Sequence, residues 1–289
     1  MSLTFVPTPL GNLRDITLRA IDVLRACDLV VAEDTRVARR LLSALEITGK
    51  RLTSYREQNA AAATAHILER AATGLVAVVS DAGMPGISDP GRELIVAARA
   101  AGIAVEVLPG PVAFVVAAVL SGFPLERLEF RGFVPRAPRK RREALTHWLL
   151  DGPATIAWYE APSRIVETLE CRAELEPTGP VFVARELSKL HEQQILGTPA
   201  EVLAALERPV RGEIVLIIAP PSEKPPRGPA TSDEIDAVID ARLDLGLTVA
   251  RAARATALTL NLDRKTIYPR VVERQRARKA TPGDEPHQR

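Results

Sequence analysis

Cysteine, aromatic residues and excess charge are all scarce in this sequence of 289 residues. Its two cysteines, Cys27 and Cys171, fit neither a disulfide framework nor the ligand spacing of a zinc site. So few cysteines are typical of a reducing cytoplasm, and we therefore expect a cytoplasmic protein. The aromatic content of 4% disfavours a stacking platform for single-stranded nucleic acid. The net charge of +2 excludes a polycation.

Long apolar runs and the common nucleotide-binding fingerprints are also missing. No apolar run approaches the length of a membrane span, and the first residues lack the pattern of a signal peptide, so we expect no membrane partner. Neither the phosphate-loop nor the dinucleotide glycine pattern occurs, which disfavours both kinds of nucleotide as ligand. Ser80 and Ser88 lack the context of a hydrolase nucleophile. The histidines are scattered, and we expect no metal site.

Apolar strand patterns alternate with helical patterns in the first part of the chain. Short strands are expected at residues 3–6, 28–32, 75–79 and 105–108, with helices between them and a polar stretch at 54–59. This alternation is typical of a mostly parallel α/β sheet. The hydrophobic content of 46% suits a globular protein of roughly two domains.

Changes in composition predict how the chain divides into domains. We place an N-terminal α/β domain at residues 1–120 and a second α/β domain with a mixed sheet at 121–219. Residues 220–231 are rich in proline and read as a linker. Residues 232–275 form a helical segment, and the final residues, 276–289, are expected to be disordered.

The helical segment resembles a helix-turn-helix. Its second helix carries Arg264, Lys265, Tyr268 and Arg270, and such a helix can place basic residues on nucleic acid. A small capping bundle that binds nothing explains the same pattern equally well. The sequence leaves both interpretations open.

The stretch from Ser80 to Gly91 forms the longest of four loops that follow strands. It contains three glycines and two prolines, and it exceeds the ~2–6 residues that usually join a strand to a helix. Ligands of open α/β sheets bind at the carboxyl ends of the strands. Loops at 7–17, 33–36 and 109–111 follow other strands, so four loops are expected to converge on one edge of the sheet. We therefore interpret 80–91 as a ligand loop.

Two clusters of charge allow a functional and a structural interpretation. Residues 33–36 (Glu-Asp-Thr-Arg) could bind a ribose or accept a proton, or could simply cap a helix and pair at the surface. Residues 136–142 include five basic residues, which form either a solvated face or a contact with phosphates. Convergence with the other loops favours function for the first cluster.

Seven motifs in order resemble a known family. They lie at residues 7–16, 32–36, 80–91, 108–111, 159–164, 184–192 and 212–216. Together they are similar to the bacterial 16S rRNA (cytidine 2′-O)-methyltransferases, of the tetrapyrrole-methylase-like class of S-adenosylmethionine enzymes. The resemblance covers about residues 3–219. It implies two α/β domains, a cleft between them for S-adenosyl-L-methionine, a homodimer, and methylation of the ribose of cytidine 1402 in 16S rRNA within the 30S subunit.

The resemblance also assigns roles to individual residues. Those expected to bind the methyl donor are Asp81, Gly83, Ile87, Ser88, Val112, Ala113, Tyr159, Leu187, Glu213 and Ile214. The chain departs from the family at Met84, where threonine is common, and at Val112, where serine is common. These departures weaken any role for side-chain hydrogen bonds there.

Further residues are candidates for RNA binding and for the methyl transfer itself. Those expected on the RNA side are Pro7, Thr8, Asn12, Asp15, Arg136, Arg139, Arg164 and Arg185. The catalytic candidates are Glu33, Asp34, Arg36, Glu160 and Lys189. The methyl donor is already activated, so the enzyme mainly positions the reactants, and a carboxylate could help to deprotonate the ribose hydroxyl.

Two other functions remain as alternatives. A methylase of a tetrapyrrole or another small molecule would share the fold, but such a substrate needs neither the basic cluster nor the terminal helices. A non-enzymatic RNA-binding or ribosome-assembly factor would need fewer shaped loops than this chain has.

Overall fold

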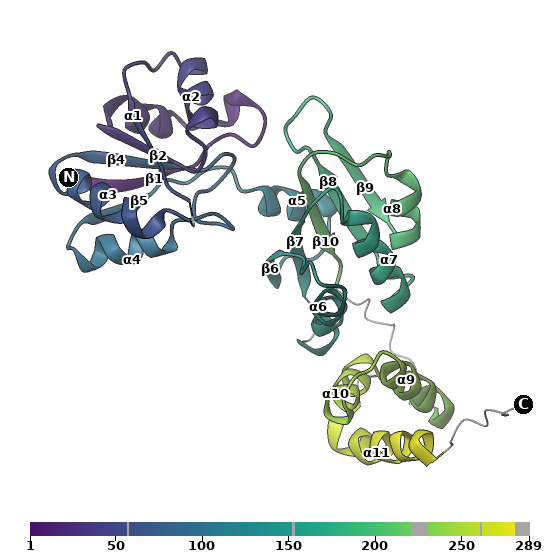
Figure 1. The fold of residues 1–289 in the computed structure, drawn as a ribbon. Coiled ribbons are helices and arrows are strands. Elements are labelled where there is room, and N and C mark those ends of the chain that lie inside the picture. Colours follow the sequence, from purple (N-terminus) through teal and green to yellow (C-terminus); the bar gives the residue numbers. More distant parts are fainter. Residues whose placement is uncertain (57, 152–153, 221–230, 261, 281–289) are drawn as a thin grey trace, which may run out of the picture.

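The computed structural model describes residues 1–56, 58–151, 154–220, 231–260 and 262–280 (Figure 1). These residues form two five-stranded sheets and a group of three helices near the C-terminus. None of the described helices is long and apolar enough to span a membrane. The predicted α/β fold with two sheets and terminal helices is confirmed.

The first sheet is parallel throughout and has the strand order β3-β2-β4-β1-β5. Its strands are β1 (Ser2–Val6), β2 (Leu29–Ala32), β3 (Arg51–Ser54), β4 (Leu75–Val79) and β5 (Ala104–Val107). The helices between them are α1 (Leu18–Ala26), α2 (Thr35–Ala44), α3 (Ala60–Thr73) and α4 (Arg92–Ala100), and a 3₁₀ turn (Leu13–Asp15) precedes α1.

Both faces of this sheet are buried, which explains why its inner strands are apolar at successive positions. In β4, Ala77 and Val79 pack with α1 and α2, while Val76 and Val78 pack with α3 and α4 on the other face. Parallel strands covered on both faces are expected to have this composition. Edge strand β3 (Arg51–Ser54) is half exposed and mostly polar, so the sequence pattern does not predict it.

The second sheet is mixed and has the order β6-β7-β10-β8-β9. Only β6 and β7 run parallel, and the other neighbours are antiparallel. Its strands are β6 (Leu128–Phe133), β7 (Thr155–Glu160), β8 (Val181–Arg185), β9 (Gln193–Gly197) and β10 (Ile214–Ile218). Helices α6 (Pro138–Asp151), α7 (Ile165–Leu175) and α8 (Pro199–Ala205) enclose a core on one face.

Helix α5 (Ala113–Ser121) packs on the other face of the second sheet, although it precedes all strands of that sheet. Its Ala117 and Ala118 are buried against Ala157, Phe182 and other residues of the sheet. Packing therefore changes from the first sheet to the second before α5, whereas the sequence placed the boundary near residue 120. Figure 1 shows α5 beside β7 and β10.

The three C-terminal helices have a core of their own. They are α9 (Ser232–Asp244), α10 (Val249–Leu260) and α11 (Arg264–Ala280), and α10 also contacts α6. Residues 276–280, expected within the disordered tail, are the last turn of α11. The linker at 221–230 and the tail at 281–289 lie outside the described residues.

Candidate functional site

The loops after β1 and β4 are tied together at the carboxyl end of the first sheet. The backbone N–H of Thr8 donates to the carbonyl of Gly83 at 2.9 Å, and the N–H of Gly83 donates to the carbonyl of Thr8 at 3.0 Å. The Thr8 hydroxyl donates to the Ser80 carbonyl at 3.2 Å, and the Ser80 hydroxyl donates to the Gly83 carbonyl at 2.8 Å. The predicted ligand loop therefore has a fixed base.

Two glycines allow the loops after β1, β4 and β5 to approach one another. Gly83 has a φ of +78°, and a Cβ there would lie 3.1 Å from Leu10 Cδ2. A Cβ at Gly110 would lie 2.5 Å from the Cβ of Pro7, closer than real side chains come. Three of the four loops predicted to converge are thus in close contact, and glycine is required at the places where they meet.

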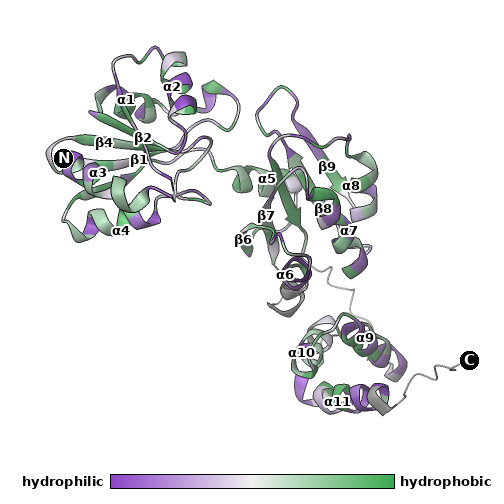
Figure 2. Cartoon of the chain, viewed as in Figure 1, coloured by the Kyte–Doolittle hydropathy of each residue, from purple (hydrophilic) through white to green (hydrophobic). Residues whose placement is uncertain are grey.

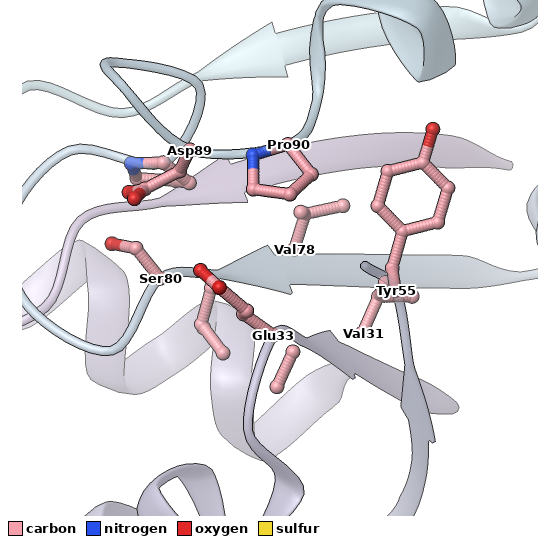
Figure 3. Close-up of a pocket in the computed structure, with 10 residues that line it drawn as sticks. Val31, Glu33, Tyr55, Val78, Ser80, Asp89 and Pro90 are labelled. Carbon is pink, nitrogen blue, oxygen red and sulfur yellow. The ribbon is translucent and has the colours of Figure 1, made fainter. Parts of the chain in front are cut away.

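Carboxyl groups from the loops after β2 and β4 gather at the same edge of the sheet. A cavity of about 10 Å³ is lined by Glu33, Ser80, Asp89 and their neighbours. Figure 3 shows the Glu33 and Asp89 carboxyl groups and the Ser80 hydroxyl at one end of it, while the Tyr55 hydroxyl points away. Asp81 lies next to this group, because its Oδ1 accepts the backbone N–H of Asp34 at 3.2 Å. The four strand-end loops therefore converge as predicted.

The closeness of these acids changes their protonation. Burial, followed by the charges of Glu33, Asp81 and Glu213, raises the pKa of Asp89 to about 7. Burial and the nearby charge of Asp81 also raise the pKa of Glu33. A carboxyl group with a pKa near neutrality can exchange a proton at physiological pH.

The second sheet contributes Glu213 and Tyr159 to the same place. Burial, with contributions from the charges of Asp89 and Glu213, raises the pKa of Tyr159 to about 12. The Tyr159 ring packs edge-on against Phe130 and Phe133, with centroid distances of 4.9 and 5.5 Å. We call the group formed by Glu33, Asp81, Asp89, Tyr159 and Glu213 the inter-domain site.

A second contact holds the two sheets together near this site. A Cβ at Gly11, in the loop after β1, would lie 2.3 Å from Lys189 Cγ and 3.0 Å from the Leu187 carbonyl oxygen. Lys189 Nζ pairs with Glu186 Oε1 at 2.8 Å and with Glu213 Oε2 at 3.2 Å. Lys189, a catalytic candidate, thus holds the edge of the site and is already paired with two carboxylates.

The remaining residues assigned to the donor lie around the inter-domain site or beneath it. Ile87 and Ser88 are in the 80–91 loop, where Ser88 has a φ of +60°. Val112 and Ala113 begin α5. Leu187 and Ile214 are buried in the two cores of the second sheet, so they support the site from below.

Two of the predicted catalytic acids are occupied by structural partners. Asp34 caps α2 by accepting the Arg36 N–H at 2.8 Å, and it pairs with the Arg36 guanidinium at 2.6 Å. These hydrogen bonds hold the pKa of Asp34 well below its usual range. Glu160 is buried, accepts from the Thr168 hydroxyl at 2.5 Å and pairs with Arg164 at 2.6 Å. Asp34 and Arg36 thus form the helix cap and the surface ion pair that were the non-functional interpretation of residues 33–36.

Sequence reasoning missed Asp89, although it lies within the predicted ligand loop. The available signal was the second acid of that loop, placed directly before a proline that restricts the backbone. A sequence pattern does not show that Glu33 and Glu213 approach it, because Glu33 follows another strand of the first sheet and Glu213 belongs to the second sheet.

Several residues assigned to RNA binding have partners within the protein. The Thr8 side chain is buried, and the Asn12 side chain accepts the backbone N–H of Arg14 at 3.0 Å. Arg164 also donates to the Val134 carbonyl, and Arg185 donates to Gln193 at 3.1 Å. Pro7 is buried against Gly110, while Asp15, Arg136 and Arg139 are exposed. Within the described residues no group of side chains is arranged to hold a metal ion.

Solved structures with a similar fold include a methyltransferase and a synthase. A cobalt precorrin-4 methyltransferase matches 75% of this chain and 94% of its own, with a TM-score of 0.59 and 17% identity. A diphthine synthase matches 76% of this chain and 90% of its own, with a TM-score of 0.58 and 13% identity. A family model described as Tetrapyrrole (Corrin/Porphyrin) Methylases matches residues 2–204. Fold and family model together define the class as the tetrapyrrole methylases.

Curated relatives narrow this class. Proteins named ribosomal RNA small subunit methyltransferase I occur in Halalkalibacterium halodurans at 37% identity (92% of this chain, 93% of the relative), in Hydrogenobaculum at 43% (76% and 96%) and in Thermotoga maritima at 41% (75% and 97%). The chain therefore belongs to the tetrapyrrole methylase family and, within it, to the ribosomal RNA small subunit methyltransferase I group. It is a methyltransferase, as the motifs predict. The latter two relatives are shorter than this chain.

Proposed function

We propose that this chain transfers a methyl group from S-adenosylmethionine to the ribose 2′-hydroxyl of cytidine 1402 in 16S rRNA, within the 30S subunit. The observation that carries the proposal is the inter-domain site, an acidic and partly aromatic group that lies where the strand-end loops of one sheet meet the second sheet. The name shared by the relatives supports rRNA as the substrate. A small-molecule methylase is the less favoured alternative.

The inter-domain site fits a cationic methyl donor. S-adenosylmethionine supplies a methyl group that is already activated on a positively charged sulfur. The carboxylates of Asp81, Asp89 and Glu213 complement that charge, and the Tyr159 ring offers an apolar surface beside them. Residues proposed to hold the donor are Asp81, Gly83, Ile87, Ser88, Val112, Ala113, Tyr159, Leu187, Glu213 and Ile214.

Proton acceptance from the ribose hydroxyl falls to Glu33 and Asp89. Asp34 and Glu160 are engaged by Arg36 and Arg164, so their charge already has a structural use. The raised pKa values of Glu33 and Asp89 bring these groups closer to the range that suits a general base at neutral pH. On this proposal one of these carboxylates would accept the proton of the 2′-hydroxyl as its oxygen bonds to the methyl carbon. The bond from that carbon to the sulfonium sulfur would break, so that the sulfur leaves as a neutral thioether.

The exposed rim of the site is the proposed approach for RNA. Asn12 and Asp15 lie in the loop after β1, and the side chain of Arg36 is 77% exposed although it pairs with Asp34. Arg139 at the start of α6 is 92% exposed. These positions leave room for a phosphate backbone alongside the carboxylates that act on the ribose.

A second copy of the chain is the proposed partner of α5. Its Val115, Val119 and Leu120 are 42%, 64% and 41% exposed, on the side turned away from the second sheet. Figure 2 shows α5 in green, the colour of hydrophobic residues. An exposed apolar helix face next to the site is typical of a protein–protein interface, and it suits a homodimer working in the cytoplasm.

A transfer assay with a radiolabelled methyl group tests the proposal. The full chain and labelled S-adenosylmethionine are incubated with 30S subunits, naked 16S rRNA or a porphyrin precursor. We expect label in the ribose of one cytidine of the rRNA and none in the porphyrin. Label in the porphyrin alone would establish the small-molecule alternative, and label in neither would contradict the proposed function.

A further inference from the structure

The basic residues of the C-terminal helices fall into two groups, of which one is neutralised within the protein. A row of ion pairs joins arginines four residues apart on α11 to aspartates four residues apart on α9. The pairs are Arg270–Asp236, Arg274–Asp236, Arg274–Asp240, Arg278–Asp240 and Arg278–Asp244. These three arginines therefore serve to hold α9 and α11 together, and their charge is already balanced.

The other group is exposed and has no acidic partner within the described part of the chain. It consists of Arg251 and Arg254 on α10 and of Arg264 and Lys265 in the first turn of α11. Helix α10 contains no acidic residue, and its two arginines are three positions apart and so share one side. Cations in the first turn of a helix oppose its dipole, so Arg264 and Lys265 do not stabilise α11.

An aromatic side chain shares a helix face with two of these cations, Arg264 and Lys265. Tyr268 is four residues after Arg264 and three after Lys265, so the three side chains lie on the same face of α11. Tyr268 is one of the few aromatic residues of the chain, and it is 42% exposed. Guanidinium and ammonium groups beside an exposed aromatic ring are suited to bind phosphates and to stack on a base.

The basic cluster at the start of α6 divides in the same way. Arg141 pairs with Glu167 at 2.8 Å, Arg142 pairs with Glu174 at 2.6 Å, and Lys140 is exposed with no ion pair among the described residues. Because α10 contacts α6, the terminal helices lie beside this part of the second domain, as Figure 1 also shows. The start of α6 thus also carries a cation, Lys140, that no acidic residue of the described chain neutralises.

We propose that Arg251, Arg254, Arg264, Lys265 and Tyr268 form an RNA-binding face, which holds the phosphate backbone of rRNA near the nucleotide to be methylated. The inference rests on the proposed function, because it takes rRNA as the substrate. Two relatives with the same name are shorter than this chain, so the face is proposed as an addition to the two α/β domains. RNA fits better than an acidic protein, because the cations are combined with an exposed ring.

Salt-dependent binding of RNA tests the face. The full chain is titrated into a fluorescein-labelled fragment of 16S rRNA at KCl concentrations between about 50 and 300 mM, with fluorescence anisotropy as the readout. The quadruple variant R251Q/R254Q/R264Q/K265Q should bind at least ~10-fold more weakly, and the slope of log K against log salt should fall by about 3, since each phosphate contact on a single strand contributes ~0.7. Tyr268→Ala should weaken binding by about fivefold with an unchanged slope.

The paired arginines provide a matched control. R270Q/R274Q removes two charges from the same helix, so we expect a lower melting temperature but a wild-type salt slope below that temperature. A folded quadruple variant with a wild-type slope would overturn the inference. Weaker binding to ribosomal proteins, with RNA binding unaffected, would overturn it in favour of an acidic protein partner.

The transfer assay separates this inference from the proposed function. Suppose that the wild type methylates 30S subunits and the quadruple variant does so with an unchanged KM. The inferred RNA-binding face is then contradicted, while the proposed methylation of rRNA is supported. Suppose instead that no RNA is methylated but the salt slope of RNA binding still falls in the quadruple variant. The proposed methylation of rRNA is then contradicted, while the RNA-binding face is supported.

Discussion

The carboxyl groups of this protein differ in what already binds them. Glu160 is completely buried and has three hydrogen-bonding partners, and Asp34 is paired with Arg36. Asp89 lies instead among other acids and is destabilised as an anion. A positively charged ligand would relieve that repulsion. The carboxyl groups whose ionised form is destabilised in the free protein are therefore those proposed to bind the donor and to accept the proton.

Donor binding should depend on pH through Asp89. This group becomes ionised as the pH rises through about 7, so its attraction for a cationic sulfonium is present above that pH and lost below it. Between pH 6 and 8, calorimetric titration should show affinity for S-adenosylmethionine rising by up to about tenfold, or ~1.4 kcal/mol. In Asp89→Asn most of this rise should be absent. The amino group of the donor titrates with both proteins, so the difference between them reports Asp89.

The contribution of Asp89 to the stability of the free protein should fall as the pH rises, whereas its contribution to donor affinity should rise. The folded state raises the pKa of Asp89 from an ordinary value near 3.8 to about 7, so ionisation destabilises the fold increasingly between those pH values. Asp89→Asn should therefore raise the melting temperature by a few degrees at pH 8 and leave it nearly unchanged at pH 4. A lower melting temperature at pH 8 would show that Asp89 is held by a partner instead.

Glu160 should act as a structural residue. Glu160→Ala leaves Arg164, whose side chain is 17% exposed, without its carboxylate, which we expect to cost about 3–5 kcal/mol of unfolding free energy in urea denaturation. Methyl transfer per folded molecule should stay within about twofold of wild type. Glu33→Gln is the matched comparison, where we expect the reverse: nearly unchanged stability, and single-turnover transfer slowed more than tenfold.

At the scale of elements, three loops form the site because they pack on one another. The bridge between Thr8 and Gly83 joins two of them, and the close approach of Gly110 to Pro7 adds the third. Each loop follows a different parallel strand, so the order β4-β1-β5 within the sheet puts their starting points side by side. The long loop at 80–91 is thus shaped by its neighbours as well as by its own glycines and prolines.

Gly110→Ala should disturb this packing. Its Cβ would lie 2.5 Å from that of Pro7, so the two loops must separate, at a cost of about 1–3 kcal/mol in stability. We expect affinity for S-adenosylmethionine to fall about tenfold, as measured by calorimetry. Gly102→Ala, where the φ of +71° causes strain but no atom lies within 4 Å, should lower stability without changing donor affinity.

At the scale of the whole molecule, α5 links the two sheets. Its small residues Ala117 and Ala118 pack on the second sheet, and its first residues follow directly from the loop that packs on Pro7. Its larger residues, Val115, Val119 and Leu120, face solvent. A second chain bound on that face would cover the helix that connects the two domains.

Val119→Asp should weaken self-association. A charge on an apolar interface disfavours burial of that face, so we expect light scattering to show a shift from dimer toward monomer at micromolar concentration. Val96→Asp, on a similarly exposed valine of α4, is the control and should leave the mass unchanged. A wild-type protein that is monomeric throughout would contradict the proposed dimer.

The sequence by itself determined the α/β class, the second mixed sheet, the loops that carry the site and the family. Apolar strands and glycine-rich loops are local patterns, and seven motifs in order are specific to one group. It did not predict β3, because a half-exposed edge strand with mostly polar residues has no clear period. It placed the domain boundary after α5, because no local pattern tells which sheet a uniformly apolar helix covers.

Only the tertiary structure decided which charged residues are free to act. Asp34 and Glu160 look as suitable as Glu33 in the sequence, yet Arg36 and Arg164 pair with them. The pKa of Asp89 is raised first by burial and then by acids of both sheets. Likewise Arg270 is neutralised by α9 and Arg264 is not. The physical reason is that charge balance and burial depend on residues distant in sequence. The 80–91 loop, long for a connection, is therefore one side of a site completed by the second sheet.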